Sequence, residues 1–296
     1  MNRTRIVLAI ASALGWGQLQ AQAPVDMTNY IDVMADAGRA KLELGLTYTN
    51  SERRDVLTGA PLEVQTGPTS FISLPTLINE AEGSSDVIVA SLGLRYGITA
   101  DLEIYGRLHA LYAQHRSQDL HHQVQRQEDS GLSDAWVGLN YRLSPDTTTP
   151  ALLGFVEAAV YERHDQRSAS LKSWMGGLTT YRAIDPIILS LTAALRWNQE
   201  RKLDNYRLNP GDFVMLTPSA AFAVNDRITL TSGWQWTSRA SDRHDGLATH
   251  FRRNHSDLLL GIGYGVAKGN SLLLNFKTDA SGHRGAELRL NWTQRF

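Results

Sequence analysis

From residue 39 onward, apolar and polar residues alternate in short segments that polar turns separate. The segment Arg284 to Phe296 is typical: Leu288 and Leu290 fall on one side of an extended chain, and Glu287 and Arg289 on the other. A period of two residues predicts β-strands. Twelve such segments can be delimited, namely 41–49, 87–97, 102–113, 134–143, 152–163, 171–183, 187–197, 214–224, 228–236, 258–266, 272–276 and 284–296.

Short and long connections alternate between these segments, and their even number places both ends on the same side. The apolar faces are mostly aliphatic and carry Tyr or Trp near their ends, which is typical of strands that cross an outer membrane with a polar face toward a lumen. A β-sandwich is the rival architecture for alternating strands. We predict an all-β, transmembrane antiparallel β-barrel of about twelve strands, with short periplasmic turns and long extracellular loops.

Two segments contain residues that do not fit the alternation. In 171–183, the adjacent residues Trp174 and Met175 compete for the lipid face. In 214–224, Pro218 lacks the N–H that a strand ladder needs, and such prolines usually lie at an edge or a bulge. We therefore expect a local bulge at Pro218.

The first 23 residues have the features of a signal peptide. Arg3 and Arg5 precede a short apolar run, Ile6 to Leu14, and Ala21-Gln22-Ala23 has the small residues of a cleavage site. The run is too short to cross a bilayer of roughly 30 Å, which needs about twenty residues. An exported chain is predicted, for which a soluble secreted protein is the alternative to a barrel.

A short N-terminal segment, residues 24–38, precedes the predicted barrel domain at 39–296. Within it, Met27, Ile31 and Met34 share a face at helical spacing. Two interpretations stay open: a loose periplasmic tail, or a short helix that enters or plugs the lumen.

Composition adds two constraints. The chain has 0 cysteines, so an exported domain would be held by burial and hydrogen bonding, which a closed barrel provides because its backbone groups pair between strands. Removing the basic leader shifts the formal net charge from -1 to about -3. No nucleic-acid partner is expected; the expected partners are outer-membrane lipid and a transported solute or polypeptide.

Two motifs resemble an outer-membrane family named after the meta-pathway of phenol degradation. One is Gly131-Leu132-Ser133-Asp134 leading into a strand, and the other is the hairpin from Leu94 to Glu103. The resemblance implies a transport barrel whose last strand, ending on Phe296, is recognised by the outer-membrane assembly machinery. Barrels that export functional-amyloid subunits are similar in build, but they carry a long N-terminal coiled coil, whereas only residues 24–38 precede the barrel here.

The polar faces of the predicted strands supply charged residues that would line a lumen. Basic residues outnumber acidic ones, so a water-filled pore would favour anions. Alternatively, the charges pair into a mesh that fills a narrow barrel. The pore-lining candidates are Arg95, Glu103, Arg107, Asp134, Arg142, Glu157, Arg196, Lys277, Glu287 and Arg289.

Histidines offer further candidate chemistry. His109, His115, His121 and His122 lie near one extracellular mouth, but their spacing does not show the three or four converging ligands of a zinc site. We expect them to be surface-loop residues. One class of twelve-stranded outer-membrane barrel is a phospholipase, but the neighbouring pair His255-Ser256 would point in opposite directions along a strand. No catalytic residue, cofactor or metal is predicted.

The stretch 56–78 is too apolar for a solvated loop, and it includes Phe71, Ile72 and Leu74. We expect a lid or constriction over the mouth, with contact to a neighbouring barrel as the alternative. The chain is predicted to be an outer-membrane channel or transporter for small solutes, aromatic or apolar ones included, with both termini periplasmic. The alternatives are a secretion pore for an unfolded polypeptide such as a functional-amyloid subunit, and a non-transport barrel that is structural or a lipid hydrolase.

Overall fold

The computed structural model describes residues 34–296 apart from ten short gaps, so the predicted signal peptide and residues 24–33 lie outside the described part. The gaps are 53–54, 59–61, 66–70, 75–77, 82–83, 119–123, 165–166, 203–205, 250 and 282–283. In the described part, no helix is long and apolar enough to span a membrane.

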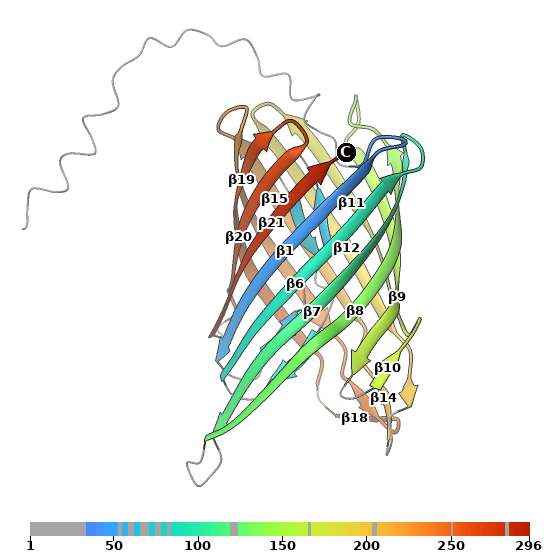
Figure 1. Ribbon diagram of the computed structural model, residues 1–296, viewed down its shortest axis with the longest axis vertical. Helices are drawn as coiled ribbons and strands as arrows, with labels where there is room; N and C mark the ends of the chain where they lie inside the picture. Colours follow the sequence, from blue (N-terminus) through green and yellow to red (C-terminus); the bar gives the residue numbers. More distant parts are fainter. Residues whose placement is uncertain are drawn as a thin grey trace, which may run out of the picture.

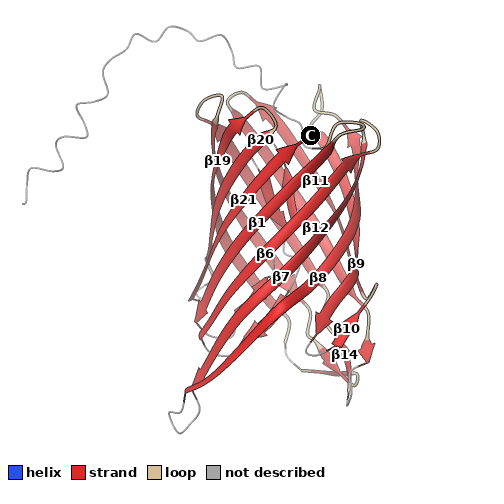
Figure 2. Ribbon diagram, viewed as in Figure 1, coloured by secondary structure: helices blue, strands red, loops and turns tan. Residues whose placement is uncertain are grey.

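Twelve antiparallel strands close into a barrel, which confirms the predicted fold class (Figures 1 and 2). Each strand pairs with its neighbours along the chain, and the last strand pairs with the first. The strands are β1 (Ala40–Glu52), β6 (Ser84–Gly97), β7 (Leu102–Gln118), β8 (Val124–Ser144), β9 (Ala151–His164), β11 (Ser173–Ile184), β12 (Ile187–Asn198), β15 (Phe213–Ala223), β16 (Ile228–Arg239), β19 (Arg253–Ala267), β20 (Asn270–Asp279) and β21 (Arg284–Arg295).

The two ends of the barrel differ. One end, the short-turn rim, carries the tight connections between β6 and β7, β11 and β12, β15 and β16, and β19 and β20. The C-terminal residue lies at the same end (Figure 1). The other end, the long-loop rim, carries the connections 53–83, 199–212 and 240–252.

Short strands occupy the long connections, which the alternation did not predict. Within 53–83, β2 (Asp55–Thr58) pairs with β5 (Ile78–Ala81), and β3 (Leu62–Gln65) pairs with β4 (Phe71–Leu74). The side chains of Phe71, Ile72 and Leu74 lie outside the described part, so their lid role stays a prediction. At the long-loop rim, β10 (Arg167–Ala169) pairs antiparallel with the end of β9, and a four-stranded sheet joins β13 (Arg201–Lys202), β14 (Arg207–Asn209), β17 (Arg243–His244) and β18 (Leu247–Ala248).

The hairpin of β7 and β8 corrects a second expectation. The predicted segments 102–113 and 134–143 leave a polar connection between them, expected as a loop from Gln114 to Ser130, but both strands continue through most of it and project beyond the other strands (Figure 1). Polar residues such as Glu128 and Asp129 lie on both faces of this extension, and both are exposed. Because a strand standing in water has no apolar face, its alternation is lost.

Along each strand, side chains point alternately to the outer and the inner face of the barrel. Large apolar residues such as Leu94, Leu191 and Leu260 are exposed on the outer face, while Leu273 and Thr217 are buried inside. Such an apolar outer face fits lipid as its solvent. In β11, Met175 is fully buried and packs in the lumen. The strand therefore presents Trp174 on the opposite, outer face.

Pro218 interrupts the pairing of β15 with β16 without shifting the register of the two strands. Leu216 pairs with Trp236 and Ser219 with Gly233, while the two positions between them are unpaired on this side. The register is the same before and after the break. The predicted bulge is therefore wrong: the missing N–H removes local hydrogen bonding, but the flanking pairs hold the alignment.

A charge on the outer face should destabilise the barrel. Leu191 is in the middle of β12 and 40% exposed. Leu191→Lys should lower the free energy of unfolding by about 2–4 kcal/mol, because the ammonium would lie in hydrocarbon. The measurement is equilibrium urea unfolding in phospholipid vesicles.

The matched control is Leu247→Lys, at a loop residue that is 76% exposed. Its effect should stay within about 0.5 kcal/mol. Equal costs for the two variants would contradict the assignment of the outer face to lipid.

Candidate functional site in the barrel lumen

Charged residues from three adjacent strands meet inside the barrel near the short-turn rim. Arg95 of β6 lies 2.7 Å from a carboxylate oxygen of Glu43 and 3.1 Å from one of Glu103. Asn140 of β8 donates to the same Glu103 oxygen at 2.7 Å. Lys41 of β1 is also fully buried in this group. The strand register brings these side chains together, because Lys41 pairs directly with Arg95.

The described end of the N-terminal segment enters this part of the lumen. The backbone N–H of Ala35 donates to Oε2 of Glu103 at 2.6 Å. Ala37 bridges to Gly97, and Gly38 donates to the Gly97 carbonyl at 2.7 Å. A side chain on Gly97 would collide with the backbone of this segment, since a Cβ there would lie 2.2 Å from the Asp36 carbonyl oxygen. No helix forms in residues 34–39.

Met34 contacts another part of the barrel wall. Its side chain packs in one buried cluster with residues of β9, β11, β12 and β15, while the neighbouring Ala35 is bonded to β7. Residues 34–35 therefore connect β7 with a stretch of wall that lies two to five strands away from it. The cluster consists of Met34, Ala151, Leu153, Tyr181, Ile188 and Ala221.

An aromatic group occupies the lumen further from this rim. Trp136 is almost fully buried, and the guanidinium groups of Arg107 and Arg196 lie 5.6 and 5.0 Å from its ring centroid. Arg107 also contacts Glu157 at 2.5 Å, and the Tyr105 hydroxyl donates to the same carboxylate at 3.1 Å. Such stacking of cations on an indole face is favourable when desolvated.

Two further ion-pair groups lie in the lumen. Glu162 accepts from Arg196 and Arg201, each at 2.8 Å. On the other side of the barrel, Glu287 contacts Lys277 at 3.0 Å and also pairs with Arg289.

The predicted pore-lining residues thus fall into distinct places. Nine of them face the lumen and form the groups above or, for Asp134, a pair with His109. Arg142 does not join them: it lies at the short-turn rim, where it donates to Asp101 at 2.7 Å and to the Ala100 carbonyl. Arg163 and Arg182, on the polar faces of the predicted segments 152–163 and 171–183, pair with Asp129 in the extension of β8 and with Asp146 in the β8–β9 connection.

The expected excess of free basic charge is not found in the described lumen. Glu162 and Asp279 were missing from the predicted acidic set. A register shift between β8 and β9 at Ala135/Trp136 changes the face on which Glu162 lies, and the predicted segment 272–276 ended before Asp279. With them, the lumen charges pair as the mesh alternative proposed. Within the mesh, the cavity bounded by Thr217, Asn275 and Lys277 measures about 30 Å³.

His109 is not a surface-loop residue. It lies inside β7, is 2% exposed, and its Nδ1 pairs with Asp134 of β8. His109 is two residues from Arg107, so both side chains lie on the lumen side of the strand. The surface-loop prediction grouped His109 with His115, His121 and His122 and did not use this spacing.

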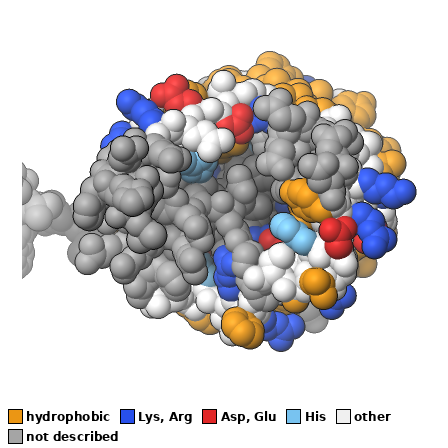
Figure 3. All heavy atoms as spheres, turned by 90° about the horizontal axis from the view of Figure 1, so that it is seen from below, with side chains coloured by type: hydrophobic (Ala, Val, Ile, Leu, Met, Phe, Trp, Pro, Cys, Tyr) orange, Lys and Arg blue, Asp and Glu red, His pale blue; other side chains and the backbone are white. Residues whose placement is uncertain are grey.

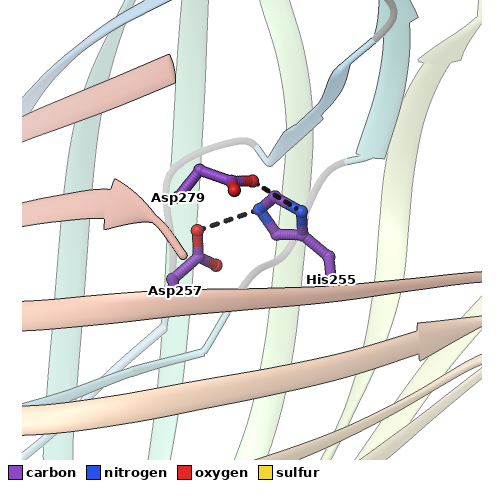
Figure 4. Close-up of side chains that lie close together, drawn as sticks. All are labelled: His255, Asp257 and Asp279. Carbon is purple, nitrogen blue, oxygen red and sulfur yellow. Dashed lines mark hydrogen bonds and ion pairs between the residues drawn. The ribbon is translucent and has the colours of Figure 1, made fainter. Parts of the chain in front are cut away.

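A second histidine group lies near the long-loop rim. The His255 ring lies between the carboxylates of Asp257 and Asp279 (Figure 4), with Nε2 2.9 Å from Asp257 Oδ1 and Nδ1 2.9 Å from Asp279 Oδ2. Sequence reasoning missed this group, because Asp279 lies across the β19–β20 hairpin. Viewed from this rim, charged side chains gather at the mouth and hydrophobic ones along the outer flank (Figure 3).

Comparisons with known proteins support the fold. No family model and no curated protein sequence matches the chain. The chain is similar to the crystal structure of an outer-membrane channel from Pseudomonas putida F1, with 14% identity and a TM-score of 0.61, over 93% of this chain and 100% of that one. The translocator domain of the autotransporter NalP from Neisseria meningitidis is similar at 9% identity and a TM-score of 0.51, over 88% and 89%. The chain thus has an outer-membrane β-barrel fold.

Removing an ion pair in the lumen should lower the free energy of unfolding more than removing an ion pair at the short-turn rim. Glu157→Gln removes the charge that Arg107 contacts, and leaving a buried guanidinium uncompensated should lower the free energy of unfolding by about 3–5 kcal/mol. The measurement is equilibrium urea unfolding in phospholipid vesicles.

Asp101→Asn is the control, since the Asp101 carboxylate contacts Arg142 but is 53% exposed. Exposed pairs contribute about 0–1 kcal/mol. A cost for Glu157→Gln as small as that of Asp101→Asn would show that water reaches and solvates Arg107.

Proposed function

We propose that this protein is a narrow outer-membrane channel for small solutes, partly closed at the short-turn rim by residues 34–36. The observation that carries the proposal is the charged lumen. Buried ion pairs contribute little to stability, since replacing them with well-packed apolar residues of similar volume often leaves the protein equally or more stable. A barrel that only had to be stable could fill its interior with apolar side chains, whereas a polar path for solutes requires charged and polar walls.

The side chains of the lumen also favour one class of transported solute. Trp136, Tyr105 and Phe155 lie in one cluster next to Arg107 and Arg196, which favours small flat solutes, aromatic ones included. A translocating polypeptide would need a wide continuous lumen, and the ion pairs between long side chains on the inner wall argue against it. The proposed membership of the phenol meta-pathway family agrees with this cargo.

Hydrolysis of lipid has less support. Both ring nitrogens of His255 face carboxylates, and the neighbouring Ser256 is on the opposite face of β19. A serine nucleophile needs its base within hydrogen-bond reach.

Orientation follows from the same proposal. The short-turn rim, with the C-terminal residue and the N-terminal segment, would face the periplasm, and the long-loop rim the exterior. Residues 1–23 would be the export signal, and the last strand, ending on Phe296, the element that the assembly machinery binds.

Single-channel conductance in a planar bilayer tests the channel and its closure together. The mature protein should give short, infrequent steps. A variant with Met34→Ser and Ala35→Pro loses the apolar contact and the N–H that Glu103 accepts, so it should give larger and longer steps.

The two failures are distinguishable. Equal steps in both proteins would contradict the closure while leaving the channel intact. If neither protein gives conductance steps, although its mobility shift on an unheated gel shows that the barrel is folded, the channel itself would be contradicted.

A further inference from the structure

We propose that His255, Asp257 and Asp279 form a binding site for a divalent transition-metal ion in the lumen near the long-loop rim. The site is independent of the proposed channel function. Its three side chains come from β19 and β20 and all lie on the inner face of the hairpin (Figure 4).

The two carboxylates favour a cation between them. Asp257 and Asp279 are directly paired across the hairpin, and their side chains are only 6% and 4% exposed. Like charges directly opposite each other in a sheet are destabilising, and burial increases that cost. The His255 ring lies between the two carboxylates.

A neutral imidazole can satisfy only one of them. It carries one N–H, so if Nδ1 donates to Asp279, the lone pair of Nε2 faces the Asp257 oxygen at 2.9 Å. Two lone pairs at that distance repel unless a proton or a metal ion lies between them. The position between Nε2 and Asp257 is therefore a cation position by construction.

The spacing is close to that of metal ligands. Imidazole and carboxylate ligands bind ions such as Zn²⁺ at about 2.0–2.2 Å, so two of them at the tetrahedral angle are about 3.3–3.6 Å apart. The contact between Nε2 and Asp257 must therefore open by roughly 0.4–0.7 Å to admit the ion, which the 32% exposed His255 side chain allows. Asp279 would hold the other ring nitrogen, as carboxylates do behind many metal-bound histidines. Imidazole favours zinc, copper or nickel over calcium or magnesium.

Access is open on one side. The His255 side chain is 32% exposed, so water from the mouth can complete the coordination shell. Lys277, two residues from Asp279, is engaged with Glu287 at 3.0 Å, and its charge will moderate the affinity without filling the site.

Isothermal titration calorimetry of the folded, tag-free protein in detergent with zinc chloride alone tests the proposal. One saturable Zn²⁺ per chain is expected. His255→Gln and Asp257→Asn should each abolish that binding, and Asp279→Asn should weaken it by about 10–100-fold, since it removes only the group that orients the ring.

His109→Gln is the matched control, because His109 has one carboxylate partner, Asp134, in a buried strand position. It should leave the titration unchanged. The chain has 9 histidines, so binding that survives both His255→Gln and Asp257→Asn would place the ion elsewhere and overturn the proposal. An absence of saturable heat in the wild type would also overturn it, leaving a proton at this position. Asp257→Asn relieves charge repulsion, so it remains informative if His255→Gln does not fold.

Discussion

The pairing of β1 with β21 is the constraint on which the rest of the structure depends. In hydrocarbon, an unpaired backbone N–H or C=O costs several kcal/mol, so a sheet survives there only if it has no edge. Twelve residue pairs, from Lys41 with Arg295 to Glu52 with Arg284, join the ends of the chain and remove that edge. Closure therefore depends on contact between the first and the last strand of the barrel.

Closure places the outer side chains against lipid and the inner side chains in the lumen. The inner polar side chains must then find hydrogen-bond and ion-pair partners among themselves. A twelve-stranded barrel is narrow enough for long side chains to meet across it. The observed ion pairs join side chains of nearby strands: Arg95 of β6 contacts Glu43 of β1 and Glu103 of β7, and Arg196 of β12 contacts Glu162 of β9. Residues 34–35 contact β7 and a cluster that begins on β9.

The strands could be predicted from sequence because lipid imposes a period of two on every segment that it contacts. Prediction failed where lipid is absent. The extended hairpin around Glu128 projects beyond the other strands (Figure 1), and the strands in 53–83 are only 4 residues long, so neither carries a long alternating apolar face. The faces of Arg107 and Glu157 were predictable, but their partners were not. Partnership depends on register and bulges, such as the shift at His109, which leave little trace in sequence.

Disulfide cross-linking at the seam tests the closed barrel most directly. Leu290 of β21 pairs with Leu46 of β1 on one side and with Leu274 of β20 on the other. The chain has 0 cysteines, so double variants carry only the introduced pair. Closure predicts that Leu46→Cys with Leu290→Cys will oxidise as readily as the hairpin control, Leu274→Cys with Leu290→Cys, and will change mobility on a heated gel. Cross-linking in the control alone would contradict closure.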